Sequence, residues 1–111
     1  MATVEEHSHS FLAESWPFLE PINTACYTNA KLLENDLPVM RVFHDHDGEW
    51  QFLSGDIEEG DTCKLICFGC IYERTPDIAI LKSLPVGWMA ERSSIDGVWN
   101  CEPYKREEDE G

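Results

Sequence analysis

Two runs of alternating apolar and polar residues predict a β-hairpin near the middle of the chain. The runs are Val39–His46 and Glu49–Ser54, and they flank Asp47-Gly48. This dipeptide suits a two-residue type I′ turn, because both central residues of that turn need positive φ. The register that such a turn sets pairs Phe43 with Phe52 and Val42 with Leu53.

Helical patterns follow the hairpin. Asp61 or Thr62 suits the N-cap of a helix that runs to about Arg74. Thr75-Pro76 predicts a second start, because a hydroxyl caps the helix and proline is accepted at its first position. Pro85 ends this second segment. Its apolar residues at helical spacing are Ile78, Leu81 and Leu84.

Three further strands are predicted, at Thr24–Thr28, Val86–Arg92 and Val98–Glu102. The last two join around Asp96-Gly97, where a two-residue loop would set Glu91 opposite Glu102. Strands, then helices, then strands predict an α+β fold, with a small antiparallel sheet and one or two helices packed on one face.

The chain has 111 residues, 42% of them hydrophobic, which is enough for one core and too few for two. We expect a flexible lead-in at residues 1–15, a single domain at 16–104 and a disordered acidic tail at 105–111. No run approaches the roughly 20 apolar residues that cross a bilayer, and the N-terminus lacks the pattern of a signal peptide. The expected location is therefore cytoplasmic.

Acidic residues dominate the composition: 22 Asp and Glu against 8 Lys and Arg, for a formal net charge of −14. The tail from residue 105 holds two bases and four acids, so the other residues still carry −12. Such a chain repels nucleic acid and anionic membranes and attracts a cationic partner. The alternative is that the charge only maintains solubility.

The acids concentrate in a stretch without Lys or Arg, between Arg41 and Lys64. With Trp50 as an aromatic anchor, they form the predicted partner-binding surface, since aromatics supply contact area and acids supply steering. The alternative is a solvated loop whose tryptophan points into the core. The residues predicted to bind the partner are Asp45, Asp47, Glu49, Trp50, Asp56, Glu58, Glu59 and Asp61.

Five cysteines in a chain without an export signal predict reduced thiols and no disulfide framework. Cys63, Cys67 and Cys70 have the spacing of one stripe along the predicted helix, which favours packing in the core. A metal cluster or a redox sensor is the alternative for this stripe.

His44 and His46 alternate along a predicted strand, so both would lie on one face as two zinc ligands. No third ligand follows at a recognisable spacing, and the alternative is a solvated strand end. We therefore predict no metal and no cofactor. The calcium-loop, phosphate-loop and nucleophile-elbow motifs are absent from the sequence, which favours a non-enzymatic protein.

Four short motifs occur in order along the chain: Trp50-Gln51-Phe52-Leu53-Ser54-Gly55-Asp56, Pro76-Asp77-Ile78, Ser83-Leu84-Pro85-Val86-Gly87 and Glu91-Arg92. In these motifs and their order the chain resembles a bacterial family of unknown function that is also catalogued among immunity proteins of polymorphic toxin systems. The resemblance covers residues 24–102. The resemblance implies a protein that neutralises a toxin by binding it, with no catalytic site. This chain departs from the family in its cysteine-rich segment and acidic tail.

Three hypotheses follow. The first is an immunity-type module that binds a basic protein such as a nuclease toxin. The second is a metal-binding or metal-dependent protein that uses His44, His46 and the cysteines. The third is a solvating scaffold domain with no specific partner.

Overall fold

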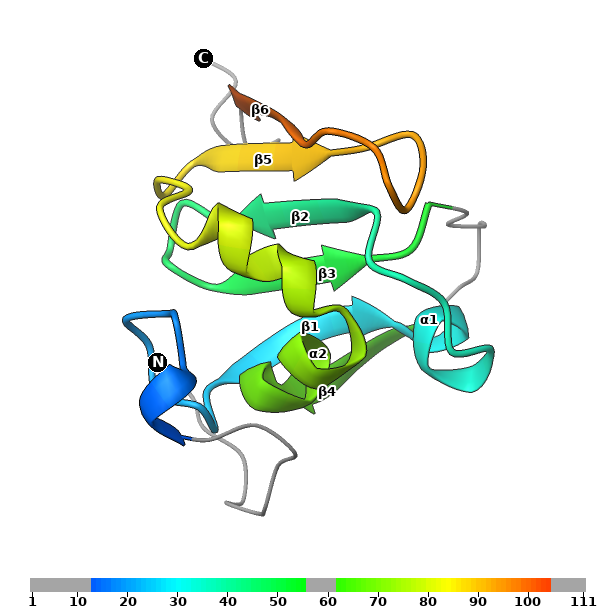
Figure 1. The fold of residues 1–111 in the computed structure, drawn as a ribbon, viewed down its shortest axis with the longest axis horizontal. Coiled ribbons are helices and arrows are strands. Elements are labelled where there is room, and N and C mark those ends of the chain that lie inside the picture. The colour runs from blue at the N-terminus through cyan, green and yellow to red at the C-terminus, as the bar shows by residue number, and fades with distance from the viewer. Residues whose placement is uncertain (1–12, 56–61, 105–111) are drawn as a thin grey trace.

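A six-stranded sheet forms the centre of the molecule (Figure 1). The computed structural model describes residues 13–55 and 62–104. The strands follow the order β4-β1-β3-β2-β5-β6 across the sheet. In chain order the elements are η1 (Ala13–Ser15), β1 (Ala25–Asn29), α1 (Ala30–Glu34), β2 (Arg41–His44), β3 (Trp50–Leu53), β4 (Cys63–Cys67), α2 (Phe68–Arg74), η2 (Pro76–Leu81), β5 (Trp88–Glu91) and β6 (Asn100–Pro103).

The predicted combination of a sheet with helices is confirmed, but the prediction of an antiparallel sheet is wrong in one respect. β1 and β3 are parallel, whereas the other neighbouring strands are antiparallel. A hairpin cannot join parallel strands, which need a longer crossover. Here α1 and β2 form that connection. After β1 and α1 the chain forms β2, which is separated from β1 by one strand position, and β3 then fills that position between β1 and β2.

The hairpin of β2 and β3 is confirmed, with a register one residue away from the predicted one. The Asp45 N–H donates to the Glu49 carbonyl at 2.7 Å, so the loop has three residues, and Gly48 takes φ +91°. A three-residue loop that ends on a left-handed glycine is a known alternative to the type I′ turn. The observed register pairs Val42 with Phe52, and both side chains are fully buried.

The predicted helix from residue 61 or 62 to Arg74 is wrong in its first half, where the chain forms β4. The Thr62 carbonyl accepts a hydrogen bond from the Ala30 N–H at 2.8 Å, so Thr62 extends the ladder to β1 and caps no helix. Asp61 lies outside the described residues. The cysteine stripe is therefore wrong too, because two of its members lie on β4 and only Cys70 lies on α2.

The second helical segment begins where Thr75-Pro76 predicts, as the 3₁₀ helix η2. The predicted capping by the Thr75 hydroxyl is wrong, because this hydroxyl makes no cap hydrogen bond to η2. It accepts a hydrogen bond from the Val39 N–H at 3.3 Å instead, and so links η2 to the segment before β2. The three apolar residues at helical spacing are all buried, as predicted: Ile78, Leu81 and Leu84.

β5 and β6 pair in a register that keeps two acids apart. Glu91 faces Asn100, and Glu102 faces Met89, so the predicted juxtaposition of Glu91 and Glu102 is wrong. The connecting loop is longer than the two residues assumed from the sequence, and this shift removes a like-charge pair that would destabilise the sheet.

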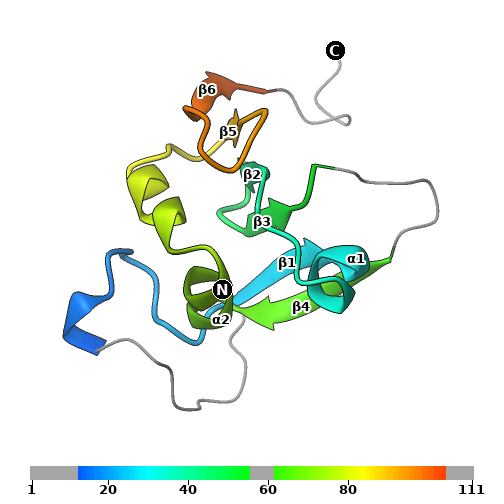
Figure 2. The ribbon, with the colours of Figure 1, turned by 45° about the vertical axis from the view of Figure 1, so that its right-hand side comes forward.

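The two faces of the sheet differ in their surroundings. One face packs against α2, η2 and the segment after η1, and both views show α2 and η2 on the same side of the sheet (Figures 1 and 2). Trp50, Phe52 and Phe68 form the aromatic centre of this core. The other face is here called the open face; its middle is exposed or half-buried, whereas Ala25, Asn29 and Cys67 on the same face are buried. One row of it crosses all six strands: Leu65, Tyr27, Gln51, Phe43, Met89 and Glu102.

Candidate functional site

The tip of the β2–β3 hairpin holds three of the predicted acidic residues. Asp45 is fixed by two neighbours, because Gln51 Nε2 donates to its carboxylate at 2.7 Å and the Tyr104 hydroxyl also donates to it. The Asp47 carboxylate accepts the Glu49 N–H at 3.1 Å within the turn. Neither carboxylate forms an ion pair with a Lys or Arg of the described residues.

Asp45 belongs to the open face, since it bonds to Gln51 of the row that crosses the sheet. Around it lie aromatic and aliphatic side chains. The ring centroids of Phe43 and Tyr104 are 5.1 Å apart, and Tyr27 and Leu65 are 36% and 60% exposed. An apolar surface with acids beside it is typical of protein-binding sites. Sequence reasoning missed Tyr27 and Leu65. Period-two alternation along β1 would have placed the side chain of Tyr27 on the face of the sheet opposite to that of Cys26.

Trp50 does not lie on this surface. It is 2% exposed, and its Nε1 donates to the Glu20 carboxylate at 2.8 Å. The interpretation of Trp50 as an exposed anchor is therefore wrong, and the alternative of a core tryptophan holds. Alternation along β3 places Trp50 on the same face as the fully buried Phe52, which is the face toward the core. Four further predicted binding residues lie outside the described residues: Asp56, Glu58, Glu59 and Asp61.

The two histidines lie in different surroundings. The His44 ring is buried and stacks on Trp50, with centroids 4.0 Å apart. Its Nδ1 lies 2.8 Å from the Leu84 carbonyl oxygen, which only accepts, so this nitrogen carries a proton. His46 is exposed in the turn and packs against Tyr104. The prediction that both lie on one strand face is wrong, because β2 ends at His44.

The cysteines are also dispersed. Cys63 and Cys101 are exposed, whereas Cys26 and Cys67 are buried. Burial, with smaller contributions from nearby charges, raises the pKa of Cys26 far above its ordinary value of 9.0 and that of Cys70 to about 11. Both thiols are therefore protonated at neutral pH. Among the described residues, no group of three His, Cys, Asp or Glu side chains could hold a metal ion.

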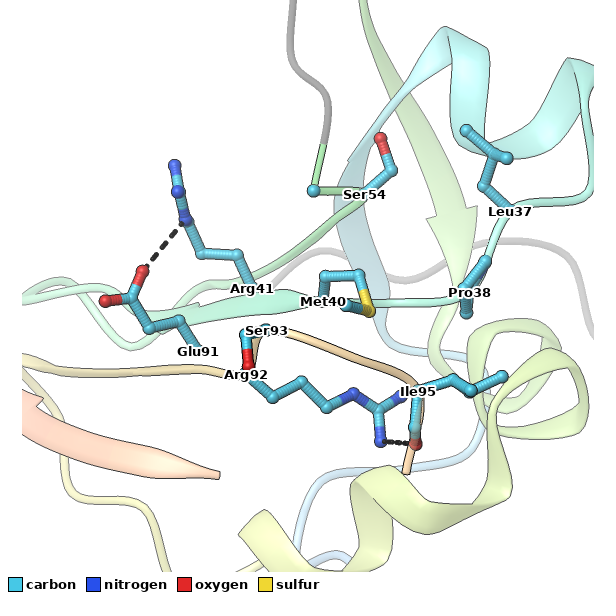
Figure 3. A pocket seen from close by; sticks show the side chains of 10 residues that line it. Leu37, Pro38, Met40, Arg41, Ser54, Glu91, Arg92, Ser93 and Ile95 are labelled. Carbon is cyan, nitrogen blue, oxygen red and sulfur yellow. Dashed lines mark hydrogen bonds and ion pairs between the residues drawn. The ribbon is translucent and has the colours of Figure 1, made fainter. Parts of the chain in front are cut away.

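A hollow of about 480 Å³ opens at the end of the sheet where β2 begins and β5 ends (Figure 3). Arg41 and Glu91 line its mouth, with 3.6 Å between Arg41 Nε and a Glu91 carboxylate oxygen. Arg92 lines its base, and its guanidinium already donates to Val39, Asp77 and Ile95. The charged side chains of the hollow thus engage one another and the backbone, and we assign no chemistry to it.

Sequence reasoning treated Arg92 as the last residue of a strand and as part of the Glu91-Arg92 motif, not as a buried side chain. Its position two residues after Ala90 places it on the covered face of β5, and this parity is the signal that could have indicated a buried arginine.

Comparisons with known proteins give no match: no protein-family profile, no curated protein and no solved structure is similar to this chain. Within residues 13–55 and 62–104, no helix has the length and apolar character needed to span a membrane.

Proposed function

We propose that this protein is a non-enzymatic, immunity-type module that binds a basic protein toxin and neutralises it through the open face of its sheet. A nuclease is the target class that suits the charge best, because its nucleic-acid site is positive and an acidic protein would occupy it. The observation that carries the proposal is the composition of the open face, which combines exposed apolar side chains with carboxylates.

The apolar part of the open face supplies contact area. Tyr27 and Leu65 are neighbours in the register between β1 and β4, and Phe43 lies in the same row two strands further on. Aromatic residues are enriched in the centres of protein interfaces, where they bury large areas at a low cost in conformational entropy. A folded sheet presents these side chains without rearrangement, which favours binding.

The acidic part supplies attraction and selectivity. Glu49 lies at the hairpin tip, and Glu102 lies in the row that crosses the open face. Charges at the rim of an interface mainly raise the association rate, and the net charge of −14 acts in the same direction. This class of partner is also the one that the resemblance of residues 24–102 implies.

A charge-reversal pair tests the proposal. The variant Glu49→Lys with Glu102→Lys changes the open face, whereas Glu14→Lys with Glu34→Lys makes the same change in net charge at two exposed residues of η1 and α1. Wild type and both variants are used as baits in extracts of the source cell, and the captured proteins are identified by mass spectrometry. A toxin assay then follows on the captured protein.

The proposal expects a basic protein that binds wild type and the control but not the open-face variant, with an association rate reduced at least about tenfold for that variant. Loss of its toxicity in the presence of wild type would establish neutralisation. Capture of no basic protein, or equal capture by all three baits, would contradict the proposal.

A further inference from the structure

We propose that the outer edge of β4, beyond which no strand of the described residues lies, is a docking site for an extended, Lys- or Arg-rich segment of the partner, which pairs with β4 as a seventh strand of the sheet. This inference rests on the proposed function for the identity of the partner as a basic protein. It adds how that partner docks: by backbone pairing at one named edge.

Hydrogen-bond parity identifies the free backbone groups of β4. In an antiparallel pair, alternate residues direct both their N–H and C=O groups toward the partner strand. The Ala30 N–H donates to the Thr62 carbonyl, and the Phe68 N–H donates to the Thr24 carbonyl. Even-numbered residues of β4 therefore face β1. The backbone groups of Cys63 and Leu65 point away from the sheet, and no other described strand lies beyond β4.

The side chains of β4 continue the open face to this edge. Leu65 faces Tyr27 in the β1–β4 register, and both are exposed. Cys63 lies on the same side, two residues before Leu65, and is exposed. A strand added to β4 would therefore place alternate side chains against Leu65 and Tyr27. Strand addition of this kind takes affinity from the backbone and specificity from alternate side chains.

The opposite edge of the sheet differs in a way that singles out β4. The Tyr104 N–H donates to the Gly87 carbonyl, so residues 100, 102 and 104 face β5, and residues 101 and 103 face outward. Pro103 stands at one of these outward positions and has no N–H to offer. Proline in this position protects a sheet edge from pairing with another chain. The described part of β4 contains no proline.

Charge selects the occupant. A second copy of this chain would bring another −14, and the mutual repulsion opposes pairing of β4 with itself. A segment rich in Lys and Arg is attracted instead. Glu49 directly precedes β3, which lies two strands from β4. A strand added beyond β4 would be three inter-strand spacings, or about 14 Å, from Glu49. At low salt this distance permits steering of the incoming segment.

Proline substitutions on β4 test whether backbone hydrogen bonds contribute to peptide binding, separately from side chains and charge. Leu65→Pro removes one outward N–H and no hydrogen bond of the β1–β4 ladder, and Cys63→Pro does the same at a second position. Cys101→Pro is the matched control, since it removes an outward N–H from β6. Leu65→Ala keeps the N–H and removes the side chain. Circular dichroism and urea unfolding identify the variants that fold.

The probe is a fluorescent eight-residue peptide of alternating Val and Lys, compared with the same peptide N-methylated at every second residue. N-methylation keeps the charge and blocks strand pairing. Binding is measured by fluorescence anisotropy, and analytical ultracentrifugation measures the self-association of wild type.

Docking at β4 predicts that Leu65→Pro or Cys63→Pro weakens peptide binding at least tenfold, that Cys101→Pro leaves it within twofold, and that the N-methylated peptide binds at least tenfold more weakly. Equal binding by the folded β4 proline variants, or by the N-methylated peptide, would overturn the inference. So would a wild-type dimer that Leu65→Pro dissociates, because a second copy would then occupy the edge. Loss of partner binding in the open-face charge variant, but not in Leu65→Pro, would overturn edge docking and leave the proposed function standing.

Discussion

The guanidinium carbon of Arg92 lies 4.3 Å from the ring centroid of Trp99. The same group donates from Nε and Nη2 to the Val39 carbonyl, at 3.2 and 2.8 Å, and from Nη1 to the Ile95 carbonyl and the Asp77 carboxylate. Only 1% of the Arg92 side chain is exposed. One arginine thus connects the end of β5 to η2, to the segment before β2 and to the loop before β6.

Replacing this arginine should destabilise the fold. Arg92→Lys keeps the charge but loses the planar guanidinium, whose several N–H groups donate to different acceptors at once. Some of these buried oxygen atoms would then have no hydrogen-bond donor. We expect the free energy of unfolding to fall by about 2–4 kcal/mol, measured by urea denaturation. Arg74→Lys is the matched control. Its ion pair with Asp36 is exposed, and a change above about 1 kcal/mol there would contradict the argument.

A buried threonine predicts the opposite outcome. The Thr28 hydroxyl has no hydrogen-bond partner among the described residues, and the residue is fully buried. Thr28→Val removes an unpaired polar group and preserves the shape, so the free energy of unfolding should stay equal or rise by up to about 1 kcal/mol.

Thr24→Val provides the contrast for Thr28. The Thr24 hydroxyl donates to the Pro21 carbonyl at 2.7 Å, and its loss should cost about 1 kcal/mol in the same urea titration. A larger loss for Thr28→Val than for Thr24→Val would show that the hydroxyl of Thr28 is satisfied.

The sequence predicted the β2–β3 hairpin and the start of η2 because local chemistry decides both. Asp47-Gly48 favours a turn in any context, and Thr75-Pro76 favours a helical start. The loop length was not determined locally. Two-residue and three-residue loops both accept this dipeptide, and the choice between them followed from burying Val42 against Phe52 in the assembled core.

The candidate site was predictable only in part, for the same reason. At the hairpin tip, Asp47 is exposed and Asp45 and Glu49 are half-buried. Charge alone indicates that such acids lie near the surface, but it does not indicate which face of the sheet their apolar neighbours occupy. Trp50 shares its face of β3 with Phe52, and packing of both against Phe68 in the assembled core buries them. The pairing of Cys63–Cys67 with β1 joins segments far apart in the chain, and no local pattern in an apolar run distinguishes such a strand from a buried helix.

Gly48 tests the observed turn. It takes φ +91°, and a Cβ placed there meets no atom within 4 Å, so Gly48→Ala costs only the left-handed backbone conformation. We expect a loss of about 1 kcal/mol in the free energy of unfolding. Gly55→Ala is the control, because its Cβ would contact Met40 at an ordinary 3.6 Å and its φ is not positive. Equal effects of the two substitutions would contradict the turn.

The thiols should react with a disulfide reagent in an order set by exposure and pKa. At pH 8, Cys63 and Cys101 should react first, because both are exposed. Cys70 should react slowly, since its pKa of about 11 leaves roughly one molecule in a thousand as thiolate. Cys26 and Cys67 should react only after unfolding. Peptide mapping of the labelled protein at increasing times checks the order, and early labelling of Cys26 would contradict it.

Alkaline pH should lower the stability of the fold through the same thiols. Burial raises the pKa of Cys26 and Cys70 above the value of 9.0 that an unfolded thiol has. Above pH 9 the folded state therefore binds more protons than the unfolded state, so the free energy of unfolding decreases as the pH rises. This contribution is complete below pH 9, and the part due to Cys70 is lost between pH 9 and about 11. Urea midpoints at pH 8, 9 and 10 measure the decrease.

Two variants test whether the thiols cause this decrease. Cys26→Ala removes the more deeply buried thiol and should make the free energy of unfolding depend less on pH above pH 9, whereas Cys101→Ala, at an exposed position, should leave that dependence unchanged. Identical pH dependence in both variants would show that other groups cause the loss.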